Sequence, residues 1–223
     1  MRTGRPYIAV AVRDALPEAT VRRLPLYLQC LEGAAGGTHL SSGEIAARAG
    51  VNAAKVRKDL SFVGCSGVRG IGYRVADLQA QIRRQLGLTR DRPMVIVGVG
   101  NLGRALADFT GFASQGFRIV GLFDVDPVTV GTRIGGIEVE PIEALPAAVR
   151  ERQAVIGVIT TPAAVAQDVA DVLAGSGVEA ILNFAPVVVR VSPEVRVRRV
   201  DLSNELRVLG YHAGRGRADT VPE

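Results

Sequence analysis

Cysteine and histidine are scarce in this sequence of 223 residues, and their scarcity argues against a fold stabilised by disulfides or by structural zinc. Two cysteines, Cys30 and Cys65, are too few for a disulfide framework. Only His39 and His212 accompany them, and the four residues lack the spacing of zinc ligands. We therefore expect no metal site.

Long apolar runs and low-complexity tracts are also missing. The longest apolar stretches, such as Met94–Val99, are the size of one strand and far shorter than the ~20 residues that span a bilayer. The N-terminal apolar run Ile8–Val12 is too short for a signal peptide. With 48% hydrophobic and 22% charged residues, the composition is that of a folded chain rather than a disordered one. We expect a cytoplasmic protein with no membrane partner.

Positive charge is unevenly distributed along the chain, whose formal net charge is +5. Residues 1–88 contain 13 Lys or Arg and 6 Asp or Glu, whereas residues 89–223 contain 14 and 16. A basic first part and a mildly acidic remainder indicate that the first part faces a polyanion and the second has another partner. We predict one domain at 1–88, beginning with a loose tail at 1–16, a second at 89–201, and a C-terminal helix and tail at 202–223.

The pattern of the first part predicts a winged helix-turn-helix domain. Ser41 and Glu44 have the spacing of a capping box at the start of a short helix. Gly50 permits a tight left-handed turn, after which Asn52 is placed to cap a second helix. Four glycines make segment 63–73 unsuitable for a helix, so a hairpin or wing is expected there. Further helices are expected at 17–33 and 75–88.

The second part alternates between strand and helix patterns. Such alternation is typical of a doubly wound, mainly parallel α/β sheet of the Rossmann type. Strands are predicted at 94–97, 117–124, 137–139, 154–159, 178–182 and 195–200. Helices are predicted at 101–114, 142–150, 162–174 and 201–212.

A glycine fingerprint, G-x-G-x-x-G, lies between the first of these strands and the helix that follows it. Gly98 suits a tight turn, Gly100 lets the backbone approach a pyrophosphate, and Gly103 allows close packing of helix on strand. Asp124, at the end of the next strand, is placed to accept a hydrogen bond from a ribose hydroxyl. A 2′-phosphate would face both Asp124 and Asp126, so NAD(H) is favoured over NADP(H).

The second part lacks the usual acid–base residues of a dehydrogenase. Segment 104–200 contains no His, Lys or Tyr, the groups that commonly move a proton beside a nicotinamide. This absence favours a sensor over an enzyme. An NAD-dependent oxidoreductase that uses another group stays open as an alternative.

Cations of the helix-turn-helix segment indicate DNA binding. Lys55 and Lys58 lie three positions apart on one face of the predicted second helix, and Arg57 is adjacent. Such cations bind phosphates and the O6 and N7 edge of guanine. Arg69, in the predicted wing, is suited to insertion into a narrow minor groove.

Four segments of the sequence, taken together, are informative: Arg57–Tyr73, Ile96–Gly103, Phe123–Pro127 and Asn183–Val187. In composition and in order they resemble the Rex family of redox-sensing transcriptional repressors. The resemblance implies a homodimer whose winged helices read a palindromic operator and whose Rossmann domains bind NADH or NAD⁺. In the family NADH releases DNA, and the C-terminal helix, here about 202–212, is exchanged between subunits.

The fingerprint and the resemblance together give two sets of candidate site residues. The expected NAD(H) contacts are Gly98, Val99, Gly100, Asn101, Leu102, Gly103, Asp124, Val125, Thr160, Thr161, Pro162, Asn183, Phe184, Ala185 and Pro186. The expected DNA contacts are Ser41, Asn52, Lys55, Arg57, Lys58, Ser61, Arg69, Gly70 and Tyr73.

Two positions depart from the family pattern at its switch. Phe109 replaces a tyrosine whose hydroxyl contacts the aspartate at the position of Asp201. Gln29 replaces a common arginine, another proposed partner of that aspartate. These departures suggest a protein that binds operator DNA but responds to NADH differently or more weakly than typical members.

Overall fold

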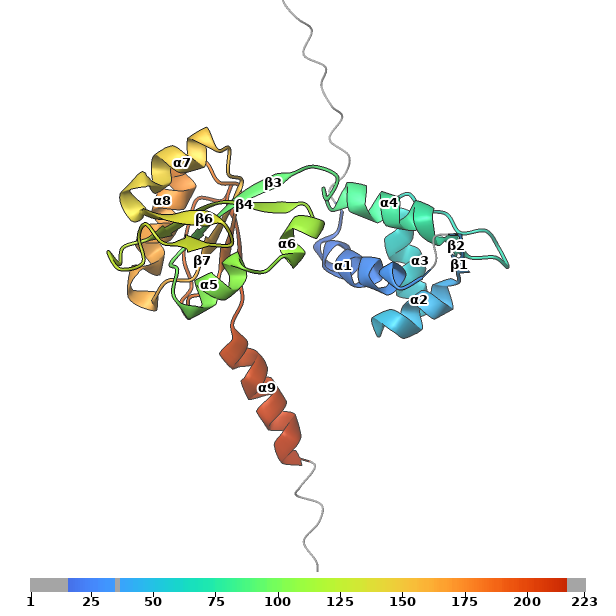
Figure 1. Cartoon of the computed structure of the whole chain (residues 1–223). Coiled ribbons are helices and arrows are strands. Elements are labelled where there is room, and N and C mark those ends of the chain that lie inside the picture. Colours follow the sequence, from blue (N-terminus) through green and yellow to red (C-terminus); the bar gives the residue numbers. More distant parts are fainter. Residues whose placement is uncertain (1–15, 35–36, 216–223) are drawn as a thin grey trace, which may run out of the picture. The chain divides into compact units, whose positions relative to one another are not determined.

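The chain divides into two compact units. The structure is a computed structural model and describes residues 16–34 and 37–215 (Figure 1). The chain splits into unit 1, Met1–Arg90, and unit 2, Asp91–Glu223. Nearly all of the expected N-terminal tail and the last part of the expected C-terminal tail lie outside the described residues. Among those described, no helix has both the length and the apolar character needed to cross a membrane.

Unit 1 is a small helical domain with a two-stranded sheet. Its elements are α1 (Glu18–Glu32), β1 (His39–Leu40), α2 (Ser42–Ala49), α3 (Ala53–Phe62), β2 (Tyr73–Arg74) and α4 (Val75–Gln85). The helices enclose one apolar core, to which α1 contributes Leu24, Leu28 and Leu31 and α3 contributes Val56 and Leu60. The predicted helices are therefore present, and they pack by their apolar faces.

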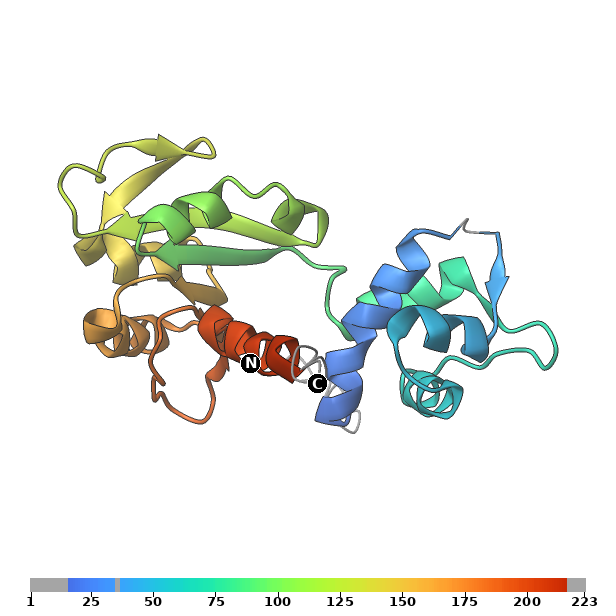
Figure 2. The same cartoon turned by 90° about the horizontal axis from the view of Figure 1, so that it is seen from below.

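The wing of unit 1 is a loop, residues 63–72 (Figure 2). One antiparallel bridge, between Val68 and Gly72, closes its tip. The two residues exchange backbone hydrogen bonds of 2.8 Å. At the base of the wing, β2 pairs with β1. Gly72 has a φ of +98°, and a Cβ there would lie 2.4 Å from the carbonyl oxygen of Leu40. Only glycine fits this position, where the wing joins the sheet.

Unit 2 contains a seven-stranded sheet in the order β5-β6-β4-β3-β7-β8-β9. Its strands are β3 (Arg92–Val97), β4 (Phe117–Asp124), β5 (Arg133–Ile134), β6 (Ile137–Pro141), β7 (Ile156–Ile159), β8 (Ala180–Asn183) and β9 (Arg196–Arg199). All neighbours are parallel except β5, which pairs antiparallel with β6 at one edge. Without β5, the order is that of the doubly wound nucleotide-binding fold, which confirms the predicted fold class.

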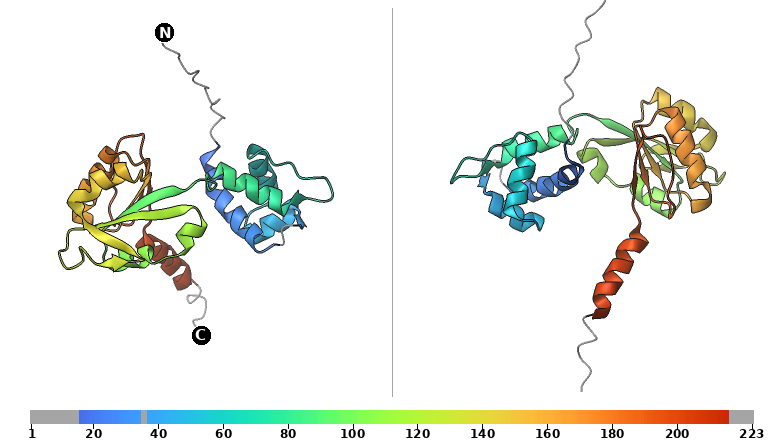
Figure 3. Two further views of the ribbon diagram at one scale, coloured as in Figure 1. Left: turned by 45° about the horizontal axis from the view of Figure 1, so that its top comes forward. Right: turned by 180° about the vertical axis from the view of Figure 1, so that it is seen from behind.

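Unit 2 has five α-helices among its described residues, of which the first four flank the sheet and the last extends away from it (Figure 1). They are α5 (Asn101–Ala107), α6 (Gly111–Ser114), α7 (Leu145–Glu151), α8 (Ala166–Ser176) and α9 (Leu202–Arg215), and 3-10 turns, Ile142–Ala144 and Ala163–Val165, precede α7 and α8. Alternate residues of β3 belong to different cores: Val95 and Val97 join the core that includes residues of α7 and α8, and Met94 and Ile96 join the other. Figure 3 shows α7 and α8 side by side on one face of the sheet.

One predicted helix of unit 2 is wrong in its extent. The segment expected to be helical over 101–114 is broken at 108–110 into α5 and α6. The ring of Phe109 folds over Gly111, where a Cβ would lie 2.4 Å from the ring, and it packs edge-on against Phe112 with centroids 5.0 Å apart. This local aromatic contact accompanies the break in the helix.

A wide apolar groove is left on the α5–α6 face. Its volume is about 610 Å³, and Met94, Phe109, Ile156, Val158 and Leu182 are among its lining residues. The residues between β8 and β9, among them Ala185 and Val189, pack in the core with α7 and α8 on the opposite face, so they do not cover this groove. On α9, conversely, the side chains of Leu202, Leu206 and Leu209 are exposed.

Candidate nucleotide pocket and nucleic-acid interface

The glycine fingerprint forms the turn between β3 and α5. Gly98 has a φ of +92°, and a Cβ there would lie 2.8 Å from Cγ2 of Thr161. At Gly103 a Cβ would lie 2.0 Å from the carbonyl oxygen of Gly98. At Gly100 a Cβ would meet no atom within 4 Å. Two glycines are therefore required by the packing of the turn, whereas Gly100 leaves the backbone open to a ligand.

Asp124, at the end of β4, fastens this turn to the neighbouring strand. Its Oδ2 accepts a hydrogen bond from the N–H of Val99 at 2.5 Å, and its Oδ1 accepts from those of Val125 and Asp126 at 2.7 and 2.9 Å. A carboxylate has about four acceptor positions. Three are used here, which leaves about one for a ribose hydroxyl.

These elements border a cavity of about 540 Å³ at the carboxyl ends of the strands. Ligands of doubly wound sheets bind at this edge. Of the predicted contacts, Gly98, Val99, Gly100, Asp124, Val125, Thr160, Thr161 and Pro162 line the cavity. Four residues that were not predicted also line it: Thr129, Ile142, Val165 and Val169.

The remaining predicted contacts lie outside the lining of this cavity. Asn101, Leu102 and Gly103 begin α5, and 183–186 starts at the last residue of β8. Asn183 is fully buried and organises its own loop, since its amide donates to the carbonyl of Val187 at 2.8 Å and its Oδ1 accepts from the N–H of Ala185 at 2.9 Å.

One polar atom of the cavity lacks a protein partner. The Oγ1 atom of Thr161 is buried and has no hydrogen-bond partner among the described residues. The neighbouring Thr160 Oγ1, by contrast, donates to the carbonyl oxygen of Gly98 at 2.5 Å. Because buried hydroxyls are nearly always hydrogen-bonded, Thr161 marks a position that a ligand can satisfy.

A second carboxylate and a cation lie at the end of β4. Hydrogen bonds from the Thr129 hydroxyl and the Val128 N–H lower the pKa of Asp126, so this carboxyl is ionised at neutral pH. Arg104 of α5 donates to Oγ1 of Thr129 at 3.3 Å. The negative charge of Asp126 was predicted from the sequence, but the nearby Arg104 was not.

The N-terminal ends of α2 and α3 are capped as expected. Ser41 Oγ accepts from the N–H of Glu44 at 3.1 Å, and Glu44 Oε2 accepts from the N–H of Ser41 at 2.8 Å, which lowers the pKa of Glu44. Asn52 Oδ1 accepts from the N–H of Lys55 at 2.8 Å. Both caps fix the turn before α3.

The solvent-facing side of α3 is basic. Lys55, Arg57 and Lys58 are exposed, and Arg57 donates to Ser42 Oγ of α2 at 3.2 Å. Ser61 is exposed and donates to the carbonyl of Lys58 at 2.7 Å. The predicted DNA contacts of this helix are thus on one accessible surface.

The predicted contacts of the wing differ in their exposure. Arg69 and Gly70 are exposed near its tip, where Gly70 has a φ of +81°. Tyr73 is half-buried at the base, and its ring packs close to Gly67, where a Cβ would lie 3.0 Å from Cζ. Arg69 is therefore accessible to a groove of DNA, while Tyr73 packs against Gly67 at the base of the wing.

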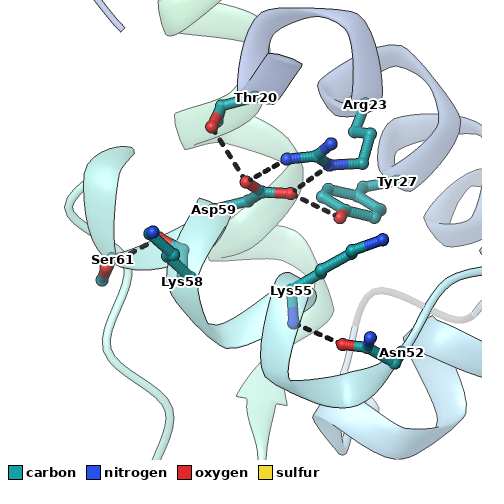
Figure 4. Close-up of polar contacts among 8 residues, drawn as sticks. All are labelled: Thr20, Arg23, Tyr27, Asn52, Lys55, Lys58, Asp59 and Ser61. Carbon is teal, nitrogen blue, oxygen red and sulfur yellow. Dashed lines mark hydrogen bonds and ion pairs between the residues drawn. The ribbon is translucent and has the colours of Figure 1, made fainter. Parts of the chain in front are cut away.

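Asp59 of α3 was not among the predicted site residues, and unlike the neighbouring cations it is buried. It is only 1% exposed, and its carboxylate contacts Thr20, Arg23 and Tyr27 of α1 (Figure 4).

Across the described residues, no group of three His, Cys, Asp or Glu side chains is placed to hold a metal ion.

Unit 1 is a winged helix-turn-helix domain with a basic recognition helix. It is joined to unit 2, a doubly wound domain with a dinucleotide-type pocket. Together the two units define the class of ligand-responsive DNA-binding proteins. Residues 15–61 match a family described as putative DNA-binding protein N-terminus, and residues 89–187 match one described as CoA binding domain. The redox-sensing transcriptional repressor Rex of Streptomyces coelicolor is 50% identical over 96% of this chain and 84% of its own length. This chain belongs to the Rex family of redox-sensing transcriptional repressors.

Other relatives agree with this assignment. The Rex repressor of Desulfitobacterium hafniense is 46% identical over 91% of this chain and 98% of its own length. The crystal structure of RSP in complex with beta-NAD+ and operator DNA has a TM-score of 0.84 and 33% identity, and it covers 91% of this chain and 94% of that chain. The two Rex relatives are named as repressors and not as enzymes, which supports the prediction of a repressor over that of an oxidoreductase.

Proposed function

We propose that this chain represses transcription as a homodimer that binds operator DNA through unit 1 and senses the ratio of NADH to NAD⁺ through unit 2. The observation that carries the proposal is the pairing, in one Rex-family chain, of an exposed basic α3 with a dinucleotide-type cavity. Because operator DNA and the NAD(H) pool meet in the cytoplasm, we place the protein there. NADH releases the operator by favouring a dimer geometry that binds DNA poorly.

The unit 2 cavity suits a dinucleotide. Its volume of about 540 Å³ lies within the usual range of ligand sites. Gly100 leaves room for a pyrophosphate, Asp124 keeps an acceptor for a ribose hydroxyl, and Thr161 has an unsatisfied hydroxyl. The carboxylates of Asp124 and Asp126 disfavour a 2′-phosphate.

The test is a titration of labelled operator DNA and protein with NADH and, separately, with NAD⁺. We expect NADH to release the operator and NAD⁺ to leave it bound. Calorimetry with NADH, NAD⁺ and ADP checks binding directly. A protein that binds the operator but takes up no NADH would be a DNA-binding paralogue whose cavity is structural. Turnover of NADH with small carbonyl substrates would instead support an enzyme.

The dimer is supported by two complementary apolar surfaces. The side chains of Leu202, Leu206 and Leu209 are exposed on α9, and the apolar groove beside α6 is open. An exposed row of leucines on a helix and an open apolar groove are both suited to burial in an interface between subunits. We infer that α9 of each subunit covers the groove of the other, so that the C-terminal helix is exchanged.

Replacing Leu206 and Leu209 by lysine is expected to convert the dimer to a monomer, because two charges would enter the apolar groove. Analytical ultracentrifugation measures the change. The control, Asn204→Lys with Arg207→Lys, places lysines on the other side of α9 at 100° per residue and should leave the dimer intact. An unchanged dimer in the leucine variant would contradict the exchanged helix.

Two residues at the switch positions suggest a weakened NADH response. Phe109 has no hydroxyl and packs against Phe112, and Gln29 is exposed and uncharged. The carboxylate of Asp201 accepts from the N–H of Asn204 and pairs with Arg199, and these bonds lower its pKa. Asp201 thus caps α9 while both of its family partners are missing here.

Restoring both partners, with Phe109→Tyr and Gln29→Arg, is expected to lower the NADH concentration needed for operator release by roughly tenfold. The two added hydrogen bonds to a carboxylate are worth about 1–2 kcal/mol in the released state. Fluorescence anisotropy of labelled operator gives the midpoint. Phe112→Tyr adds a hydroxyl to the neighbouring ring and serves as control. Complete release from the unmodified protein at low NADH would contradict the weakened response.

A further inference from the structure

A buried carboxylate joins the recognition helix to α1. Asp59 Oδ1 accepts from Thr20 Oγ1 at 2.9 Å and from Arg23 Nη2 at 2.8 Å. Its Oδ2 accepts from Arg23 Nε at 2.6 Å and from the Tyr27 hydroxyl at 2.7 Å (Figure 4). The four bonds use about all the acceptor positions of a carboxylate. Asp59 is therefore satisfied entirely by α1.

The charge of Asp59 is maintained despite its burial. Burial alone raises the pKa of this carboxyl, but hydrogen bonds from Arg23, Tyr27 and Thr20 outweigh that effect and lower the pKa below its usual value. Replacing a buried ion pair with apolar side chains is often neutral or stabilising. Stability is thus a weak explanation for this arrangement, and a unique orientation of the helix is a better one.

The other contacts of α3 in the core are not directional. Val56 and Leu60 pack among apolar side chains, including Leu24 and Leu28 of α1. Apolar packing tolerates small rotations and slides, whereas hydrogen bonds weaken steeply when their angles change. The four bonds at Asp59 consequently define how α3 is rotated against α1.

This rotation decides where the basic side chains point. Lys55 precedes Asp59 by one helical turn and Lys58 is its neighbour, and both are exposed while Asp59 is buried (Figure 4). Reading a base edge needs a donor placed to within a fraction of an ångström, whereas phosphate contacts tolerate more variation.

We propose that Asp59 is a positioning residue for operator recognition, which holds α3 at the rotation where its cations meet base edges. The proposal rests on the proposed function, in which α3 reads the operator. It predicts that losing the Asp59 contacts lowers the preference for operator over random DNA. Binding to random DNA should persist, because every cation of the surface is retained.

The test compares Asp59→Asn with the unmodified full chain. The ratio of affinities for operator and random duplexes is measured by fluorescence anisotropy over a range of salt concentrations. We expect the ratio to fall about tenfold or more, the loss of about one base contact. Affinity for random DNA and its salt dependence should stay within about twofold, since the salt dependence follows the number of phosphate contacts.

Glu32→Gln is the matched control, because it breaks another link of α1, the 2.9 Å ion pair with Arg83 of α4. Its ratio should not change. If Asp59→Asn does not fold, Thr20→Val with Tyr27→Phe removes two donors, keeps the ion pair and should lower the ratio several-fold. An unchanged ratio in a folded variant, or equal losses on both DNAs, would overturn the positioning role. A wild-type protein without operator preference would instead contradict the proposed function.

Discussion

Replacing Asp124 by alanine is expected to weaken NADH binding roughly 100-fold and to leave operator binding by the ligand-free protein intact. The carboxylate contributes a charge-assisted hydrogen bond to a ribose hydroxyl, worth about 2 kcal/mol. It also orders the glycine turn through the N–H groups of Val99, Val125 and Asp126. Loss of that order adds about 1 kcal/mol, and the sum corresponds to the stated factor.

Isothermal titration calorimetry with NADH measures this loss, and anisotropy of labelled operator measures DNA binding. Asp91→Ala is the control, because it removes a carboxylate of unit 2 that pairs with Arg118 and does not line the cavity. NADPH should lose less affinity than NADH, since a repelling charge is removed while Arg104 stays nearby. A folded Asp124→Ala protein that has lost operator binding would contradict the separation of roles between the two units.

Local sequence signals predicted the parts of the fold that depend on neighbouring residues. The capping box at Ser41 and the cap at Asn52 join residues three positions apart. The glycine fingerprint similarly combines a short spacing with a strand before it and a helix after it. Such signals can be found in one sequence because their geometry is set by the adjacent backbone.

Features that depend on distant residues were not predictable in this way. Asp59 was overlooked beside the cations of α3, because its partners Thr20, Arg23 and Tyr27 are 39, 36 and 32 positions away. The break after α5 likewise accompanies the packing of the Phe109 ring over Gly111. Sequence periodicity indicates which side of a helix is buried but not which polar groups meet there.

Removing one cation from α3 and one from the wing, with Lys58→Ala and Arg69→Ala, is expected to lower operator affinity by about 10²-fold. Both side chains are exposed in the structure, on separate elements of unit 1. Each contact with DNA is worth about 1–3 kcal/mol when it reads a base. Each phosphate contact also releases about 0.9 of a counterion, so the slope of log affinity against log salt should decrease by about 1.8 if both bind phosphates.

The control removes two positive charges from unit 2 with Arg118→Ala and Arg133→Ala, which pair with Asp91 and Glu138. Operator affinity and its salt slope should change little in this control, although the net charge falls equally. NADH affinity should be unchanged in the unit 1 variant. Equal losses in both variants would mean that overall charge, and not the α3 and wing surface, attracts DNA. A decreased slope confined to Lys58→Ala and Arg69→Ala assigns the phosphate contacts to that surface, whereas Asp59→Asn should alter sequence preference with the slope retained.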